Sequence, residues 1–263
     1  MKAIICYYSG SGNTKLACEK IAREIGNVEF TLFDIVTDGV PELELFDVVG
    51  FACFTDFGGI PFLMQSFIKG MNPQKQYSFV LNTYGFMCGK TLLMLHDEVA
   101  AKGFNVFDGL SLHTPENYPP MISRGMANEQ APNNKELIKF NDFILSLKQN
   151  FDRIDQKIEI KEKKIYIGMI ATLLPGYPRT KARKDMGDKF VNQELCTQCG
   201  TCETGCPYNA IELNPFPVFD MEKCYGCWHC YNHCPSKAIY TKKMRDKGHY
   251  PKPIAQFKAK MQG

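Results

Sequence analysis

Eight of the twelve cysteines in this chain fall in two copies of one spaced pattern. The copies read C-T-Q-C-G-T-C-E-T-G-C-P from Cys196 to Pro207 and C-Y-G-C-W-H-C-Y-N-H-C-P from Cys224 to Pro235. In the spacing C-x2-C-x2-C-x3-C-P, three close thiolates can hold one four-iron cluster, while the fourth reaches the cluster of the other copy. The pattern therefore predicts two [4Fe-4S] clusters that share ligands between the copies.

The crossing rule gives each predicted cluster three ligands from one copy and one from the other. The first set is Cys196, Cys199, Cys202 and Cys234, and the second set is Cys224, Cys227, Cys230 and Cys206. The repeat continues beyond the ligands, because the sequence C-P-x2-A-I that starts at Cys206 returns 28 positions later at Cys234. We interpret the two copies as an internal duplication.

A zinc site or a disulfide framework is the alternative, since C-x2-C pairs also bind zinc. Zinc sites use four ligands in two spaced pairs, whereas here two quartets each end in Cys-Pro. His229 and His233 lie inside the second copy, but four cysteines already complete each cluster, so we expect neither histidine to be a ligand. On these residues the segment of roughly residues 188–241 resembles bacterial-type ferredoxins with two [4Fe-4S] clusters. The resemblance implies a small α+β domain.

The preceding part of the chain alternates strand-like and helix-like stretches, as in an open parallel α/β sheet. The expected strands are Lys2–Tyr8, Glu29–Ile35, Asp47–Phe54, Tyr77–Thr83 and Asn105–Leu112. The expected helices are Thr14–Ile25, Pro61–Lys69, Lys90–Lys102 and Lys135–Phe151. The crossover around Pro41 is short for a connection between parallel strands, so we expect its helix to be reduced to a turn.

A loop of glycine and hydroxyl residues joins the first expected strand to the first helix. It comprises Ser9, Gly10, Ser11, Gly12, Asn13 and Thr14. Its glycines permit a tight turn, and its hydroxyls and the backbone N–H groups at the helix start can bind a phosphate. The loop lacks the lysine spacing of an NTP-binding P-loop. An ordinary turn with a helix cap is the alternative.

Two aromatic and glycine-rich loops follow the third and fourth expected strands. They comprise Thr55, Asp56, Phe57, Gly58 and Gly59, and then Thr83, Tyr84, Gly85, Phe86, Met87, Cys88 and Gly89. A doubly wound sheet binds its ligand outside the carboxyl ends of its strands, so we expect these loops to lie beside the first loop. Together the three loops resemble those of flavodoxin, over roughly residues 1–150.

The resemblance to flavodoxin implies a doubly wound parallel α/β sheet of five strands in the order 2-1-3-4-5, with FMN as its cofactor. The S/T-x-S/T-G-x-T phosphate loop of that family matches the segment from Ser9 to Thr14. The two later loops would hold the isoalloxazine ring, with Phe57 and Tyr84 as candidates to stack on it. The chain departs from the family in its short second crossover and in the lack of tryptophan in either loop.

These motifs predict a division of the 263 residues into three parts. Residues 1–151 would form the FMN-binding domain, 152–187 a basic connector, and 188–263 the ferredoxin domain with a basic surface tail. Residues 1–150 carry 12 Lys and Arg against 16 Asp and Glu, while residues 151–263 carry 19 against 12. Cluster thiolates would cancel most of that basic excess, so we expect a solvated face or a docking patch for an acidic redox partner rather than a nucleic-acid site.

The chain shows neither a membrane-spanning apolar segment nor a secretory signal at its start, so we expect a soluble cytoplasmic protein. In the cytosol thiols stay reduced, and a dozen cysteines therefore favour metal ligation over disulfides and an oxygen-poor cell. Among the remaining cysteines we interpret Cys6 and Cys18 as core residues. Cys53 and Cys88 lie beside the flavin loops, where inert packing and reaction with a substrate are the alternatives. We interpret His113, at the end of the fifth strand, as structural.

These expectations favour an electron carrier in anaerobic metabolism, with FMN and two [4Fe-4S] clusters, that exchanges electrons with redox proteins. Two other functions stay open. The first is a flavin-dependent reductase of a quinone, a nitro compound or an activated alkene, which would need a proton donor such as Tyr84, Cys88 or His113 at the flavin. The second is a redox sensor, which would need a DNA-binding or signalling module that the sequence does not show.

Overall fold

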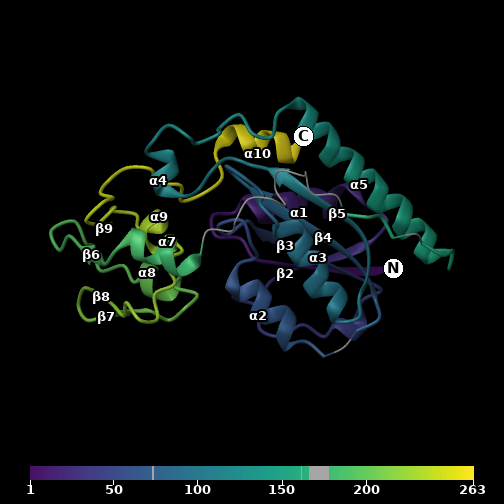
Figure 1. Ribbon diagram of the computed structural model, residues 1–263, viewed down its shortest axis with the longest axis horizontal. Helices are drawn as coiled ribbons and strands as arrows, with labels where there is room; N and C mark the ends of the chain where they lie inside the picture. The colour runs from purple at the N-terminus through teal and green to yellow at the C-terminus, as the bar shows by residue number, and fades with distance from the viewer. Residues whose placement is uncertain (73, 161, 166–177) are drawn as a thin grey trace. The chain divides into compact units, whose positions relative to one another are not determined.

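The computed structural model describes residues 1–72, 74–160, 162–165 and 178–263 (Figure 1). The chain forms two compact units. The sheet unit comprises Met1–Pro115, Asn128–Gly176 and Ile254–Gly263, and the cysteine unit comprises Glu116–Ala127 and Tyr177–Pro253. None of the helices within the described ranges has the length and apolarity needed to cross a membrane.

A parallel five-stranded sheet forms the centre of the sheet unit. Its strands are β1 (Lys2–Tyr7), β2 (Glu29–Asp34), β3 (Val48–Phe54), β4 (Tyr77–Tyr84) and β5 (Asn105–His113). They lie in the order β2-β1-β3-β4-β5, and every neighbouring pair is parallel. The predicted doubly wound order 2-1-3-4-5 is confirmed. The inner strands are buried on both faces, which explains their continuous apolar runs.

Helices cover both faces of this sheet, and each face has its own apolar core (Figure 1). The helices are α1 (Asn13–Glu24), α2 (Phe62–Gly70), α3 (Thr91–Ala101), α5 (Asn134–Asp155) and α10 (Ala255–Gln262). Helices α1, α5 and α10 bury side chains such as Ile21 and Phe140 on one face. Helices α2 and α3 bury Met64 and Leu95 on the other. Between β2 and β3 the chain forms only the 3-10 helix η1 (Leu43–Leu45), in agreement with the short crossover.

The expected basic surface tail is instead a helix of the sheet unit. Phe257 and Met261 of α10 are 0% and 1% exposed and belong to the same core as α1. The guanidinium of Arg23 in α1 donates a hydrogen bond to the carbonyl of Met261. The spacing of four residues puts Phe257 and Met261 on one face of a helix. This spacing indicated a helix with a buried face, but the polar composition of the segment concealed it.

The cysteine unit is small and built from short elements. They are α4 (Pro119–Ile122), α7 (Arg179–Met186), β6 (Lys189–Val191), α8 (Thr201–Thr204), β7 (Ile211–Leu213), β8 (Pro217–Phe219), α9 (His229–His233) and β9 (Ile239–Thr241). β6 pairs antiparallel with β9, and β7 pairs antiparallel with β8. β6, α8 and β7 begin 28 positions before β8, α9 and β9, so the duplicated sequence has a duplicated structure.

Residues Glu116–Ala127, which follow β5 in the sequence, belong to the cysteine unit. The ring of Tyr118 packs edge-on against Trp228 with centroids 6.0 Å apart, and the Asn232 side-chain amide donates to the carbonyl of Asn117. This division differs from the predicted domain boundaries, which assigned the segment to the first domain. As boundaries of independently folding domains, 1–151 and 188–263 stay predictions. Residues 161 and 166–177 of the predicted connector lie outside the described residues.

Candidate cofactor sites

The predicted phosphate loop turns sharply into the first turn of α1. Gly12 precedes the helix with φ at 96°, a left-handed conformation that glycine adopts without strain. The hydroxyl of Ser9 accepts hydrogen bonds from the backbone N–H groups of Gly12 (3.1 Å) and Lys15 (3.3 Å). The start of a twelve-residue helix therefore lies directly behind a loop of hydroxyl residues, an arrangement that favours anion binding.

Two buried side chains tie this loop to neighbouring strand ends. Oγ1 of Thr14 lies 2.8 Å from Oγ1 of Thr83, the penultimate residue of β4. Nδ2 of Asn13 donates to the carbonyl of Pro115, two residues after β5. Thr14 and Asn13 are 1% and 5% exposed. The first loop is thereby fixed against the carboxyl ends of β4 and β5.

The loops that follow β3 and β4 contact each other closely. A Cβ atom on Gly89 would lie 2.4 Å from the Cα of Gly58, so this approach requires glycine. The carbonyl of Gly58 accepts from the N–H of Lys90 (2.9 Å), and the carbonyl of Gly59 accepts from the Thr91 hydroxyl (3.1 Å). Thr55 Oγ1 accepts from Nδ2 of Asn82. The three predicted loops thus meet at the same edge of the sheet.

The aromatic residues of these loops are disposed differently from one another. Phe57 sits in a tight turn with φ at 52°, closed by two hydrogen bonds between the backbones of Asp56 and Gly59. Tyr84 stacks on His113 with ring centroids 5.0 Å apart and 7° between the planes, and burial raises the pKa of its hydroxyl to about 12. Phe86 is 55% exposed. Of these three rings, that of Tyr84 is already stacked and that of Phe86 is open to solvent.

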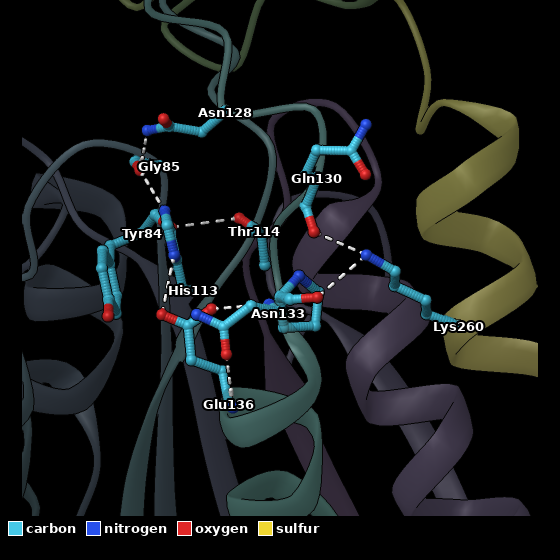
Figure 2. Close-up of polar contacts among 10 residues, drawn as sticks. Tyr84, Gly85, His113, Thr114, Asn128, Gln130, Asn133, Glu136 and Lys260 are labelled. Carbon is cyan, nitrogen blue, oxygen red and sulfur yellow. Dashed lines mark hydrogen bonds and ion pairs between the residues drawn. The ribbon is translucent and has the colours of Figure 1, made fainter.

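His113 is held on both sides, as Figure 2 shows. Its Nδ1 lies 3.0 Å from the carboxylate of Glu136, and its Nε2 lies 2.8 Å from the carbonyl of Gly85. The side-chain amide of Asn128 donates to the same Gly85 carbonyl. His113 thus fixes the backbone of the loop that follows β4, here called the β4 loop. The sequence placed His113 at the end of a strand but did not indicate this positioning role.

Glu136 in turn belongs to the start of α5. Its other oxygen accepts from the Asn133 backbone, while the Asn133 side chain accepts from the Glu136 N–H, which makes a capping box. Lys260 of α10 donates to the carbonyls of Gln130 and Pro132 just before this box (Figure 2). The C-terminal helix is therefore part of the support of the β4 loop.

Of the cysteines outside the duplicated pattern, Cys6, Cys18 and Cys53 are buried in the apolar cores and Cys88 is half-buried. Burial raises the pKa of the thiols of Cys6, Cys18 and Cys53 far above the usual range. Burial also raises the pKa of the Cys88 thiol, which lies in the β4 loop. Thiols in this state are protonated near neutral pH and react poorly as nucleophiles.

Four cysteines from the two copies line one cavity of the cysteine unit. The cavity holds about 310 Å³ of empty space, part of it open to solvent. Cys196, Cys199 and Cys202 come from the first copy, and Cys234 comes from the second. This is the first ligand set that the crossing rule predicted. Four thiols that line one cavity are the set of donors that a four-iron cluster needs, and Leu213, Pro217 and Ile239 add apolar side chains to the lining.

Hydrogen bonds to sulfur repeat in the two copies. The N–H of Ala210 donates to Sγ of Cys206 (3.4 Å), and 28 positions later the N–H of Ala238 donates to Sγ of Cys234 (3.2 Å). The Thr201 hydroxyl lowers the pKa of the exposed Cys199 thiol. Such bonds stabilise negative charge on sulfur, as a cluster ligand requires.

The second set is more deeply embedded and lies beside a lysine. Burial raises the pKa of Cys227 to about 11, so ionisation there needs a nearby cation or bound iron. Nζ of Lys189 donates to Sγ of Cys230 (3.1 Å). Burial lowers the pKa of Lys189, but the charges of Cys230, Cys224 and Cys227 outweigh this effect and leave it raised.

The histidines of the second copy contact each other. The rings of His229 and His233 stack with centroids 4.0 Å apart, and neither lines the cavity of the first set. Across the described ranges, no three His, Cys, Asp or Glu side chains gather closely enough to hold a single metal ion. The four thiols of the first set line a cavity, and they do not converge on the position of a single metal ion.

Comparison with known proteins identifies the cysteine-rich segment. The family described as 4Fe-4S dicluster domain matches residues 195–238. A ferredoxin of Pyrobaculum islandicum is 41% identical over 51 residues, which are 19% of this chain and 48% of that protein, so the chain spans about half of the length of this relative. An uncharacterized ferredoxin of Methanocaldococcus jannaschii is 32% identical over 63 residues, 22% of this chain and 82% of that one.

A solved structure resembles the other part of the chain. A flavodoxin from the domain Archaea superposes with a TM-score of 0.44 and 20% identity, covering 58% of this chain and 99% of that one. The sheet has the strand order β2-β1-β3-β4-β5, which is that of flavodoxin, and this order makes the fold flavodoxin-like.

Proposed function

We propose, from the premise that residues 195–238 belong to the 4Fe-4S dicluster ferredoxins and follow a flavodoxin-like sheet, that this chain is an electron-transfer protein with FMN and two [4Fe-4S] clusters. Clusters transfer single electrons and FMN takes up one or two, so the combination connects one-electron and two-electron chemistry. Redox proteins of anaerobic metabolism would be the donor and the acceptor.

The observation that carries this proposal is the cavity shared by the two copies. Cys234 is 32 residues or more from the other three cysteines in sequence, yet it lines the same cavity as Cys196, Cys199 and Cys202. A four-iron cluster needs four thiolates, and this cavity together with the sulfur hydrogen bonds supports one that takes its ligands from both copies.

In the sheet unit, the three adjoining loops support FMN as the second cofactor. The segment from Ser9 to Thr14 would bind the phosphate at the start of α1, where backbone N–H groups and hydroxyls supply donors. Lys15 is exposed in the first turn of α1 and adds positive charge there. The loops after β3 and β4 would hold the ring system, and their mutual contact through Gly58 and Gly89 keeps them at a fixed separation.

The geometry argues against one of the three candidate proton donors of a small-molecule reductase. A reductase needs a proton donor directed at the flavin. Both ring nitrogens of His113 already face Glu136 and the Gly85 carbonyl, so this histidine is committed to the loop. Assay of quinone, nitro and activated-alkene reduction by the reduced protein distinguishes the two functions, since a carrier shows no saturable turnover of any of them.

The proposal is tested by purifying the chain without air and quantifying its cofactors. We expect about eight iron, about eight sulfide and one FMN per chain, as two four-iron clusters and one flavin require. After partial reduction, rapid mixing with a one-electron donor should show electron exchange between clusters and FMN at a rate independent of protein concentration. A protein that binds zinc, or that lacks flavin when all iron is present, would refute the proposal.

A further inference from the structure

The internal duplication places a buried lysine beside one set of cysteines and a proline beside the other. β6 begins at Lys189 and β8 begins at Pro217, 28 positions later, so the two residues are equivalent in the two copies. Lys189 is 7% exposed, and its Nζ donates to Sγ of Cys230 at 3.1 Å. Pro217 lines the cavity of the first set, which includes Cys196. The equivalent position is therefore a cation at one site and apolar at the other.

Two arginines of α7 add to this difference. The guanidinium of Arg183 donates to the carbonyls of Cys224 and Met221, both at 3.0 Å. The guanidinium of Arg179 lies over the ring of Tyr225, 4.1 Å from its centroid, and Tyr225 follows Cys224 directly. Among the described residues that line the cavity of the first set, none is charged. Lys189, Arg179 and Arg183 thus place three cations beside residues of the second set.

A cation beside a cluster changes the free energy of its reduction. Reduction adds one negative charge to a site that is already negative, so a nearby positive charge stabilises the reduced state more than the oxidised one. A hydrogen bond from N–H to a ligand sulfur acts in the same direction. Lys189 supplies both the positive charge and the hydrogen bond. Because it is shielded from water, its effect on the free energy of cluster reduction is far less screened than that of a surface lysine.

We propose that Lys189 gives the second cluster a more positive reduction potential than the first, so that, of the two clusters, the second is reduced first. The second cluster is the one bound by Cys224, Cys227, Cys230 and Cys206. The inference rests on the proposed function, which supplies both clusters. One electron passes from a low-potential one-electron donor to the four-iron core, and no bond is formed or broken.

The variant Lys189→Met tests the proposal, because methionine is unbranched, apolar and of similar length. We expect the equilibrium constant for one-electron reduction of the second cluster to fall at least tenfold, which is about 59 mV, while the first cluster is unchanged. Lys223→Gln is the matched control. Lys223 also precedes the second set, but its side chain is 64% exposed and paired with Asp220, so both potentials should stay at the wild-type values.

Unchanged potentials in a Lys189→Met protein with full iron content would overturn the inference. A second measurement uses the wild-type protein and does not depend on the variant. During stepwise reduction with dithionite, proton NMR of the cysteine β-methylene groups reports which cluster takes the first electron. We expect the signals of Cys224, Cys227 and Cys230 to shift first. If those of Cys196, Cys199 and Cys202 shift first, the inference fails, whereas loss of iron in wild type would instead refute the proposed function.

Discussion

Individual polar side chains in this chain bind partners that are far away in the sequence. The hydroxyl of Thr14, in the predicted phosphate loop, lies 2.8 Å from that of Thr83, and both residues are buried. In the cysteine unit, His249 stacks on Tyr231 with centroids 4.2 Å apart, and its Nδ1 lies 3.0 Å from the carbonyl of the same tyrosine. Each contact holds a loop in place, and each can be tested by a substitution that preserves the shape of the side chain.

Thr14→Val keeps the shape of the side chain and removes its hydroxyl. The buried Thr83 hydroxyl then loses its partner, which should cost about 1–3 kcal/mol of unfolding free energy and weaken FMN binding. Thr14→Val with Thr83→Val should cost less than the sum of the single variants, because no orphaned hydroxyl is left. Denaturant unfolding and FMN fluorescence titration measure the two effects. Strictly additive costs would show that the two hydroxyls do not interact.

We expect His249 to make the stability of the cysteine unit depend on pH. Burial lowers its pKa below the ordinary value of 6.5, and its buried Nε2 has no hydrogen-bond partner among the described residues. Because the unfolded state binds the proton more readily, the stability from this group is complete above pH 6.5 and is lost as the pH falls below it. His249→Phe keeps the stacking and should flatten this dependence between pH 7.5 and 5.5. Denaturant unfolding at each pH checks the slope, and an unchanged slope would exclude His249 as its source.

Local periodicity predicted most elements of the sheet unit. Each of the five strands and the helices beside them show the repeats that a buried strand or an amphipathic helix requires. The carboxyl ends of parallel strands share one edge, so the meeting of the three loops followed as well. Helix α10 did not, because a short segment rich in polar residues conceals the spacing of Phe257 and Met261, and the burial of this face depends on contact with α1, more than two hundred residues earlier. The stacking of Tyr84 on His113 likewise depends on the order of β4 and β5.

Phe257→Ala tests whether α10 is an integral element of the sheet unit. Phe257 is fully buried in the core that α1 and α5 share, so the loss of its ring should destabilise the sheet unit by about 3–5 kcal/mol. Gln262→Ala, on the exposed side of the same helix, should change stability by less than about 0.5 kcal/mol. Circular dichroism during denaturant unfolding measures both. A small effect of Phe257→Ala would mean that the helix is dispensable.

At the scale of the whole molecule, neither unit is one continuous piece of chain. The sheet unit is made of three segments, and the cysteine unit of two. The duplicated copies are also interlocked, since each small sheet pairs one strand from each copy, β6 with β9 and β7 with β8. A fragment that ends at residue 151 would therefore lack α10. A single copy of the cysteine pattern would lack both its partner strands and its fourth ligand.

The crossed ligand sets make a prediction that distinguishes interlocked copies from independent ones. Cys234→Ala lies in the second copy, but we expect it to destroy the first cluster, because Cys234 lines the cavity with Cys196, Cys199 and Cys202. Iron and sulfide should fall to about half, and the remaining cysteine NMR signals should be those of the second set. FMN should stay bound, since its loops belong to the sheet unit, and Cys88→Ala should lose no iron. If Cys234→Ala instead removed the signals of Cys224, Cys227 and Cys230, each copy would bind its own cluster and the crossing would be wrong.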